Sequence, residues 1–369
     1  MSKRLAYILG GLAAIILVAV AVLYYLTRPL PELTVATWAG PYSRAQANGM
    51  FHPFGDSRHV DVRIALYDGG LEELRQMVGN NHYDWDVVDL ELPDAIAACR
   101  LGLLEHIDAG QLPAGANGTP AARDFVPGAI GPCWVGSVVY SQVIAYAPNV
   151  FGNAHPISAA DFFDIQRFPG PRALRRATAK FNLELALLAD GVKPEDVYAT
   201  LSTPDGVERA LAKLNTLRRS LVWWDTSADA VAMLKDGRAV FATTLNGDVH
   251  DAAAHGNKVG VIWDRQMFQL DAFGILKGGP RVERALDFVR FATGSEPLAR
   301  VASWVPYGPA RRSSFALVPP NPESHAVVTA ELPTNPQNFA TAFAIDDEWW
   351  QLHGADVEPR WQSWIARLP

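Results

Sequence analysis

The segment 66–99 is the most informative stretch of the chain, because its apolar and polar positions predict alternating helices and strands. After a Gly-Gly turn, apolar residues recur at helical spacing, at Leu71, Leu74 and Val78. Residues 86–90 form a short apolar run that is typical of a buried strand. Pro93 then opens a second helix, so the order is turn, helix, strand, loop and helix.

Two carboxylates stand at the end of this predicted strand, Asp89 and Glu91. In an open α/β sheet, ligands bind beyond the carboxyl ends of the strands. The pattern therefore predicts a ligand site at this edge, and its acids suit a cationic ligand. The alternative is a solvated turn or a negative charge at the start of the following helix.

The same patterns continue along the rest of the chain. Strands are predicted at 33–38, 60–66, 135–146, 222–224, 239–244, 259–263 and 268–276. Helices are predicted at 45–54, 161–168, 177–190, 194–199, 204–217, 227–235, 282–293 and 346–368. Strands that alternate with helices favour an α/β protein. No nucleophile–base pair, zinc spacing or phosphate-binding loop is recognisable, so we expect neither an enzyme nor a metal or other cofactor.

The N-terminus predicts export from the cytoplasm. Residues 5–26 are an uncharged run that as a helix would span about 33 Å, enough to cross a bilayer core. Lys3 and Arg4 precede the run, which keeps the N-terminus on the cytoplasmic side. A cleaved signal peptide with a site near Ala19–Ala21 is the alternative. The length of the run favours an uncleaved anchor that tethers a periplasmic protein to the inner membrane.

Composition supports a packed, acidic protein. Apolar residues make up 49% of the chain and charged residues 19%, which excludes a disordered protein. The net charge of −7 argues against nucleic acid as a partner and is compatible with cationic solutes. The 339 or so residues after the apolar run are enough for about two domains.

Cys99 and Cys133 are the two cysteines of the chain. In an oxidising compartment an isolated pair is most simply a disulfide, and the alternative is a pair of buried thiols.

Several motifs, in this order along the chain, resemble the periplasmic solute-binding proteins of ABC importers, above all the spermidine/putrescine-binding type. They are TVATWAG at 34–40, YDGGLEEL at 67–74, DWDVVDLE at 84–91, LNG at 245–247, VIWD at 261–264 and VPYGPAR at 305–311. The resemblance implies a two-lobed α/β fold, the class II periplasmic-binding-protein fold, here with an N-terminal transmembrane helix. It implies that lobe 1 comprises residues 31–142 and 267–320, and lobe 2 residues 143–266 and 321–369, with residues 1–30 as the anchor.

The resemblance also implies a function without catalysis. The protein would bind a small cationic solute, a polyamine such as spermidine or putrescine, in the cleft between the lobes and deliver it to an ABC permease. Carboxylates would hold the ammonium ends and aromatic rings the methylene chain. Two alternatives stay open: a binder of another amine-bearing solute, such as an amino acid or opine-like compound, and a membrane-tethered sensor or adaptor.

The site residues carried over by the resemblance are acids, aromatics and one amide. Asp271 matches the amine-binding aspartate of the family, and a lone carboxylate in an apolar run needs a partner. Asp89, Glu91 and Asp347 are further candidate acids, although Asp347 also fits a helix N-terminal charge. The remaining candidates are Trp38, Tyr42, Asn246 and Tyr307.

Three features depart from the polyamine-binding pattern. Leu245 and Gln269 stand where the family has aromatic residues, and both departures remove a stacking surface. Arg175 and Arg176 lie where polyamine binders place an acid. This pair indicates either a charged surface or a ligand that carries a carboxylate.

Overall fold

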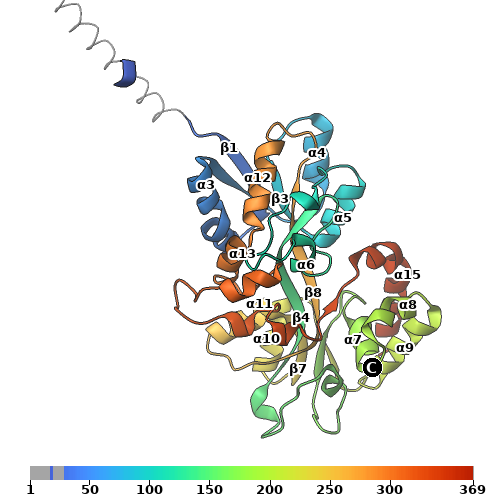
Figure 1. Cartoon of the computed structure of the whole chain (residues 1–369). Coiled ribbons are helices and arrows are strands. Elements are labelled where there is room, and N and C mark those ends of the chain that lie inside the picture. Colours follow the sequence, from blue (N-terminus) through green and yellow to red (C-terminus); the bar gives the residue numbers. More distant parts are fainter. Residues whose placement is uncertain (1–16, 20–28, 369) are drawn as a thin grey trace, which may run out of the picture.

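The computed structural model describes residues 17–19 and 29–368. The chain forms two lobes joined by two long strands, β4 (Trp134–Tyr146) and β8 (Gly260–Ile275), which run from one lobe into the other (Figure 1). These strands pair antiparallel along their length, with irregularities between Gly136 and Val138 and between Gln142 and Ile144. The whole sheet has the order β2-β1-β3-β8-β4-β7-β5-β6, so β4 and β8 belong to both halves.

The first lobe contains the parallel strands at one end of this sheet. Its strands are β1 (Glu32–Trp38), β2 (Asp61–Tyr67), β3 (Val87–Glu91) and the short β9 (Gly308–Pro309). Its helices are α2 (Pro41–Gln46), α3 (His52–Arg58), α4 (Glu72–Asn80), α5 (Leu92–Arg100), α6 (Ala121–Asp124), α12 (Val282–Ala292) and α13 (Ser295–Ala302). A π-helical turn, Ala47–Phe51, connects α2 with α3. The helix predicted at 45–54 is therefore part of a longer helical run.

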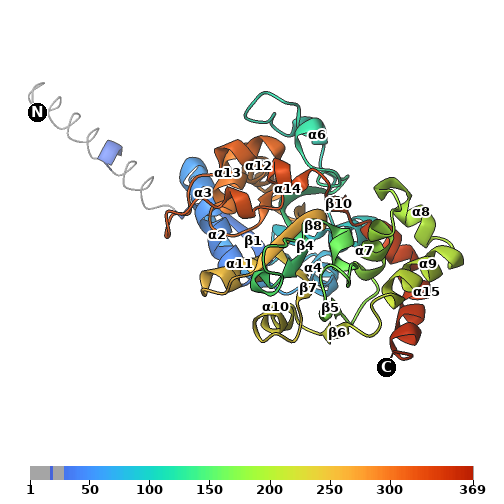
Figure 2. The same cartoon turned by 90° about the horizontal axis from the view of Figure 1, so that it is seen from below.

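The second lobe contains the other end of the sheet. Its strands are β5 (Arg172–Arg175), β6 (Leu221–Trp224), β7 (Phe241–Leu245) and β10 (Phe343–Ala344). Its helices are α7 (Asn182–Ala189), α8 (Val197–Leu201), α9 (Pro204–Asn215), α10 (Ser227–Lys235), α11 (Asn246–Ala254) and α15 (Asp347–Ile365), and α14 (Pro336–Phe339) lies on the segment that precedes β10. In Figure 2, α12 and α13 lie on one side of the central strands and α8, α9 and α15 on the other.

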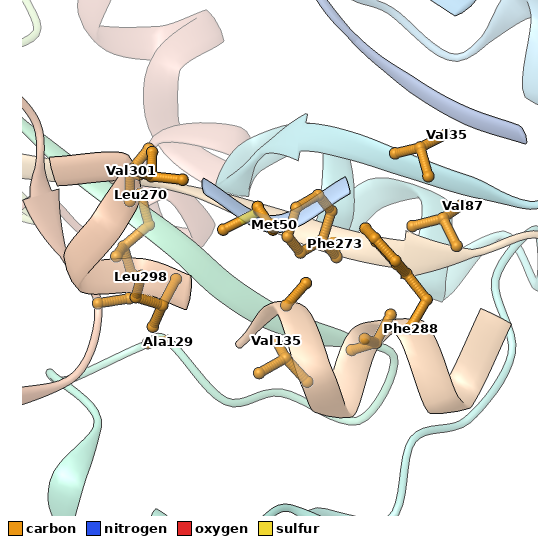
Figure 3. Close-up of a cluster of buried hydrophobic side chains, with 14 of the residues drawn as sticks. Val35, Met50, Val87, Ala129, Val135, Leu270, Phe273, Phe288, Leu298 and Val301 are labelled. Carbon is orange, nitrogen blue, oxygen red and sulfur yellow. The ribbon is translucent and has the colours of Figure 1, made fainter. Parts of the chain in front are cut away.

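Each lobe has its own buried core. In the first, Phe273 of β8 packs against Phe288 of α12, with ring centroids 5.6 Å apart (Figure 3). In the second, the tryptophans of α15 supply much of the core: Trp361 is fully buried and stacks on Trp364 at 5.1 Å. The helical spacing of these tryptophans is thus explained by packing. Burial of such large rings is the main stabilising contribution of α15.

Two sequence predictions differ from the structure. The strands predicted at 259–263 and 268–276 are one continuous strand, β8. The polar residues 264–266 between them have no register partner on β4, because the pairing of the two strands is irregular at that point. The helix predicted at 161–168 is only a short 3-10 turn, Ala159–Phe162. The buried guanidinium of Arg172 holds the rest of that segment in a loop by donating to the carbonyl oxygens of Phe162 and Phe168.

The disulfide Cys99–Cys133 is confirmed, with the two Cα atoms 5.7 Å apart. It ties the end of α5 to the segment that leads into β4. Within the described residues, no helix is long and apolar enough to span a membrane. The predicted anchor at 5–26 lies outside those residues, apart from 17–19.

Candidate binding site

Three carboxylates gather where β3 ends. Glu91 of β3 is the direct register partner of Asp271 on β8, and Asp89 is the partner of Phe273, two residues further along. Because side chains alternate between the faces of a strand, Asp89, Glu91 and Asp271 share one face. We call these three residues the acidic cluster. The structure thus brings together the acids predicted on β3 and the aspartate predicted on the return strand.

Asp89 is the innermost member of the acidic cluster and is fully buried. Its carboxylate accepts a hydrogen bond of 2.7 Å from Gln46 Nε2 and one of 3.1 Å from Ser137 Oγ. Gln46 is held in turn by the hydroxyl of Thr37. Burial raises the pKa of Asp89 to about 6, although these donors oppose the rise. Every donor is neutral, so the local charge of Asp89 is not compensated.

Asp271 lies nearer the cleft, and only 7% of the residue is exposed. Among the described residues, no donor makes a hydrogen bond to its carboxylate. Ser137 Oγ lies 3.0 Å from its backbone oxygen, which competes with Asp89 for the one hydroxyl hydrogen. Burial, followed by the charges of Asp89 and Glu91, raises the pKa of Asp271 well above its usual value. A buried carboxylate without a donor is unfavourable, and a cationic donor would satisfy it.

Three tyrosines lie near the acidic cluster. The rings of Tyr42 on α2 and Tyr307 meet edge to face at 5.6 Å, and the ring of Tyr140 on β4 lies 6.5 Å from that of Tyr307. Burial raises the pKa of all three, to about 12 for Tyr307, and the charge of Asp271 adds to each rise, after that of Asp89 in the case of Tyr42. We call these residues the tyrosine cage. Aromatic faces beside a carboxylate are a favourable environment for an ammonium group.

A cavity of about 230 Å³ lies beside Tyr42 and Tyr307, and Asp248 and Asp251 of α11 are also among its lining residues, whereas Asp271 and Tyr140 are not. Tyr42 and Tyr307 line one wall, and Leu245 and Gly247 at the end of β7 line the other. The cavity thus lies between the lobes at the carboxyl ends of strands, where ligands of α/β folds bind.

The side chain of Asn246 forms hydrogen bonds that hold the residues around this cavity in place. Its side-chain oxygen accepts from the backbone N–H of Ser141 at 2.9 Å, and its Nδ2 donates to the carbonyl oxygen of Pro306 at 2.5 Å. The amide therefore connects β4 with the residue before Tyr307. This use leaves its predicted contact with a ligand untested.

Asp347 forms an ion pair that the sequence did not reveal. Lys180 Nζ lies 2.6 Å from its Oδ1, and Gln269 Nε2 donates to the same oxygen at 3.3 Å. Its Oδ2 is buried without a partner in the part of the chain that the structure describes. The charge at the start of α15 is instead supplied by Asp346, whose Oδ1 accepts from Trp349 N at 2.8 Å.

The two arginines differ in their surroundings. Arg175 ends β5, its guanidinium carbon lies 5.8 Å from the centre of the Trp224 ring, and its Nε is buried without a partner among the described residues. Arg176 is about half exposed and lies 4.0 Å from Asp225. The buried donor of Arg175 is therefore the one that a ligand could satisfy.

Trp38 takes a different position from the other predicted aromatics. Its neighbour Thr37 faces the acidic cluster, so Trp38 points to the opposite face of β1 and packs against Tyr67, with centroids 5.1 Å apart. Its Nε1 is buried without a partner within the described residues. Its predicted stacking on a ligand stays a prediction.

The sequence resembles proteins of known class. A family model described as bacterial extracellular solute-binding protein matches residues 49–338. A gamma-aminobutyric acid-binding protein of Pseudomonas aeruginosa is 36% identical over 336 residues, which are 91% of each chain.

Solved structures agree with this match. An ABC transporter substrate-binding protein from Bradyrhizobium japonicum has a TM-score of 0.75 and 29% identity, over 91% of this chain and 99% of the other. A structure described as the Atu4243–GABA receptor has a TM-score of 0.72 and 28% identity, over 91% and 98%. These likenesses confirm the two-lobed α/β periplasmic-binding-protein fold. They do not single out the spermidine/putrescine-binding type.

Family membership supports the predicted periplasmic location and a permease partner, whereas the membrane tether stays a prediction. The proteins to which this chain is similar are solute-binding components rather than enzymes. The chain belongs to the bacterial extracellular solute-binding protein family and is a solute-binding protein of an ABC transporter.

Proposed function

We propose that this protein binds a small solute that carries a primary ammonium group and a carboxylate, such as gamma-aminobutyric acid (GABA), in the cleft between its lobes. The observation that carries this proposal is the carboxylate of Asp271, which is almost buried, lacks a donor among the described residues and faces the tyrosine cage. An ammonium group would supply three hydrogen-bond donors and a positive charge, which the described surroundings of this carboxylate do not provide.

The second lobe offers a group for the opposite end of such a solute. Arg175 ends β5, which runs parallel to β7, so its side chain starts from the same edge as Leu245 in the cavity wall. Its buried, unpaired Nε would donate to a carboxylate. A solute with charges of both signs would therefore contact both lobes, and contacts with both lobes favour the closed arrangement.

A polyamine fits this arrangement less well. A second ammonium group placed beside Arg175 would meet a like charge, which is unfavourable at close distance. Leu245 and Gln269 also replace two stacking aromatics of the polyamine-binding pattern. The proposal is in line with two similar proteins, one described as a gamma-aminobutyric acid-binding protein and the other as a GABA receptor. The sequence predicted a cationic solute, and the present proposal specifies an amino acid-like solute that carries charges of both signs.

The test is calorimetric titration of the purified full-length protein with GABA, putrescine, butylamine and butyrate. GABA should bind at least tenfold more tightly than each of the other three. Butylamine lacks the carboxylate, butyrate lacks the ammonium group, and putrescine carries a second ammonium group in place of the carboxylate. Arg175→Gln should remove this preference of GABA over butylamine. Arg176→Gln is the matched control and should leave it unchanged. Tighter binding of putrescine than of GABA would contradict the proposal.

A further inference from the structure

We propose that solute binding releases a proton from the buried carboxyl pair Asp89–Asp271, and that Asp89 is a positioning residue that sets this proton release without contacting the solute. This inference rests on the proposed binding of an amine beside Asp271. It adds a property that amine recognition alone does not require.

The first step is the position of Asp89. It is fully buried behind Asp271, and its two oxygens are taken by Gln46 and Ser137. Ser137 Oγ also lies 3.0 Å from the backbone oxygen of Asp271, so one hydroxyl links the two aspartates. After burial, the charge of Asp89 is the largest cause that raises the pKa of Asp271, whereas Asp89 itself has no exposed surface that a solute could contact.

The second step is the charge of the surroundings. The titratable groups that face the pair are Tyr42 from α2, Glu91 from β3, Tyr140 from β4 and Tyr307 from the segment before β9. All of them are acids. Burial raises the pKa of Glu91, and the charge of Lys180 only opposes this rise, since Lys180 is paired with Asp347 at 2.6 Å. Within the described residues, no cation therefore compensates Asp89 and Asp271.

The third step follows from these two. Two buried carboxylates without a cation do not both ionise, so the ligand-free pair holds a proton. The direction of both pKa shifts agrees with this state. When an ammonium group enters beside Asp271, its positive charge favours the doubly ionised pair. The carboxyl O–H bond breaks, the proton passes to the buffer, and the ammonium group keeps its own three N–H bonds.

The consequence is an affinity that depends on pH. Below the pKa of the ligand-free pair, one released proton makes the affinity rise about tenfold per pH unit, and above it the affinity is constant. Free GABA contributes little between pH 5.5 and 8, because its groups titrate near the values of an ordinary carboxyl and an alkylammonium.

The experiment measures the released proton directly. Full-length protein is titrated with GABA at several values between pH 5.5 and 8 in two buffers of different ionisation enthalpy, and the difference in heat gives the number of protons. We expect about one proton released per GABA at the acid end and fewer at pH 8. GABA binding without proton release at the acid end would overturn this inference and leave the proposed function standing. Absence of binding for GABA, butylamine and putrescine alike would overturn both.

Asp89→Asn separates this role from a structural one. The asparagine keeps an acceptor for one of the two donors, and Asp271 then ionises without a charged neighbour behind it. Binding should persist, and the proton count should fall by at least half. The control is Asp287→Asn, an exposed acid paired with Arg58, which should release as many protons as the wild type. An unchanged proton count in Asp89→Asn would contradict the role of Asp89. If that variant does not fold, the proton count of the wild type still tests whether solute binding releases a proton.

Discussion

Asp271 and Glu91 face each other as direct register partners across β8 and β3, at the point where β3 reaches the cleft. Like charges directly opposite each other on paired strands destabilise a sheet. Lys180 offsets part of the charge of Glu91, but no cation contributes to the pKa of Asp271, so a cation bound beside Asp271 would relieve this unfavourable arrangement. This relationship connects the stability of the ligand-free protein with its recognition of solute.

Asp271→Asn should therefore stabilise the ligand-free protein. The substitution removes a buried carboxyl whose ionisation is unfavourable, because it lacks a hydrogen-bond donor among the described residues and shares one proton with Asp89 in the ligand-free protein. The expected gain in the free energy of unfolding is about 1–3 kcal/mol. Urea denaturation at pH 7.5 measures it. Asp287→Asn, which breaks an exposed ion pair with Arg58, should change stability by less than about 1 kcal/mol. A clear loss of stability in Asp271→Asn would show that the carboxylate has a stabilising role.

The ligand-free protein should become less stable as the pH rises from 5 to 8, in part because of Glu184. This fully buried residue of α7 accepts from Trp350 Nε1 at 2.6 Å, and burial raises its pKa to about 7. The folded state then binds more protons than the unfolded state, so the stabilisation is fully present below the unfolded pKa and is lost as the pH rises through about 7.

Urea denaturation across this pH range tests the contribution of Glu184. In Glu184→Gln the decline in the free energy of unfolding should be smaller by about 2–4 kcal/mol. Glu208→Gln, an exposed acid that pairs with Arg360, should keep the wild-type profile. A profile in Glu184→Gln as steep as that of the wild type would exclude this residue as a cause.

The disulfide between Cys99 and Cys133 should contribute substantially to stability. It closes a loop with a sequence separation of 34 residues, for which the chain-entropy estimate is about 3–4 kcal/mol. The double variant Cys99→Ser/Cys133→Ser should lose about this free energy of unfolding in urea under oxidising conditions. Addition of reductant should destabilise the wild type and leave the double variant unchanged. An equal effect of reductant on both proteins would contradict this assignment.

A set of contacts outside the acidic cluster should affect how readily the lobes close. Arg100 at the end of α5 pairs with Glu348 on α15 and donates to Gln351 Oε1 at 3.1 Å, and Gln351 Nε2 donates to the carbonyl oxygen of Pro93 at 2.8 Å. These bonds join a helix of the first lobe to a helix packed on the second. Because they cross from one lobe to the other, a movement of the lobes away from each other would break them.

Arg100→Ala should weaken GABA binding about twofold to fivefold, which corresponds to the energy of an exposed ion pair. The preference of GABA over putrescine should stay the same, because the contact is remote from Asp271. Arg58→Ala is the matched control: it breaks an ion pair of similar exposure, 45% and 43% for its two side chains, within the first lobe. Titration of both variants measures the effect, and equal losses in the two would argue against a specific role of Arg100.

Part of the site could be predicted from the sequence. The apolar run before Asp89 and Glu91 placed two acids at the end of a strand, and the lone charge in the run around Asp271 indicated a residue with a special partner. The disulfide followed from an isolated cysteine pair in an exported protein. These features follow from the order of apolar, charged and cysteine residues along short segments, which can be read from one sequence.

The other part depends on register and on loops. Tyr140 lies in a long β-rich run whose faces were ambiguous, and only its pairing with Gln269 across β4 and β8 shows that it faces the cleft. Lys180 lies in the loop before α7, where the helix predicted from 177 does not begin until Asn182. Asn246 was predicted from a motif to contact ligand, but which partners an amide takes is decided by tertiary contacts.

A crystal structure of the protein with GABA is the most direct test of the central claim. The account predicts the ammonium nitrogen within about 2.7–3.0 Å of a carboxylate oxygen of Asp271, between the rings of the tyrosine cage, and the GABA carboxylate on the side of Arg175. A GABA molecule bound with its ammonium group away from Asp271, or with its carboxylate in the tyrosine cage, would contradict it.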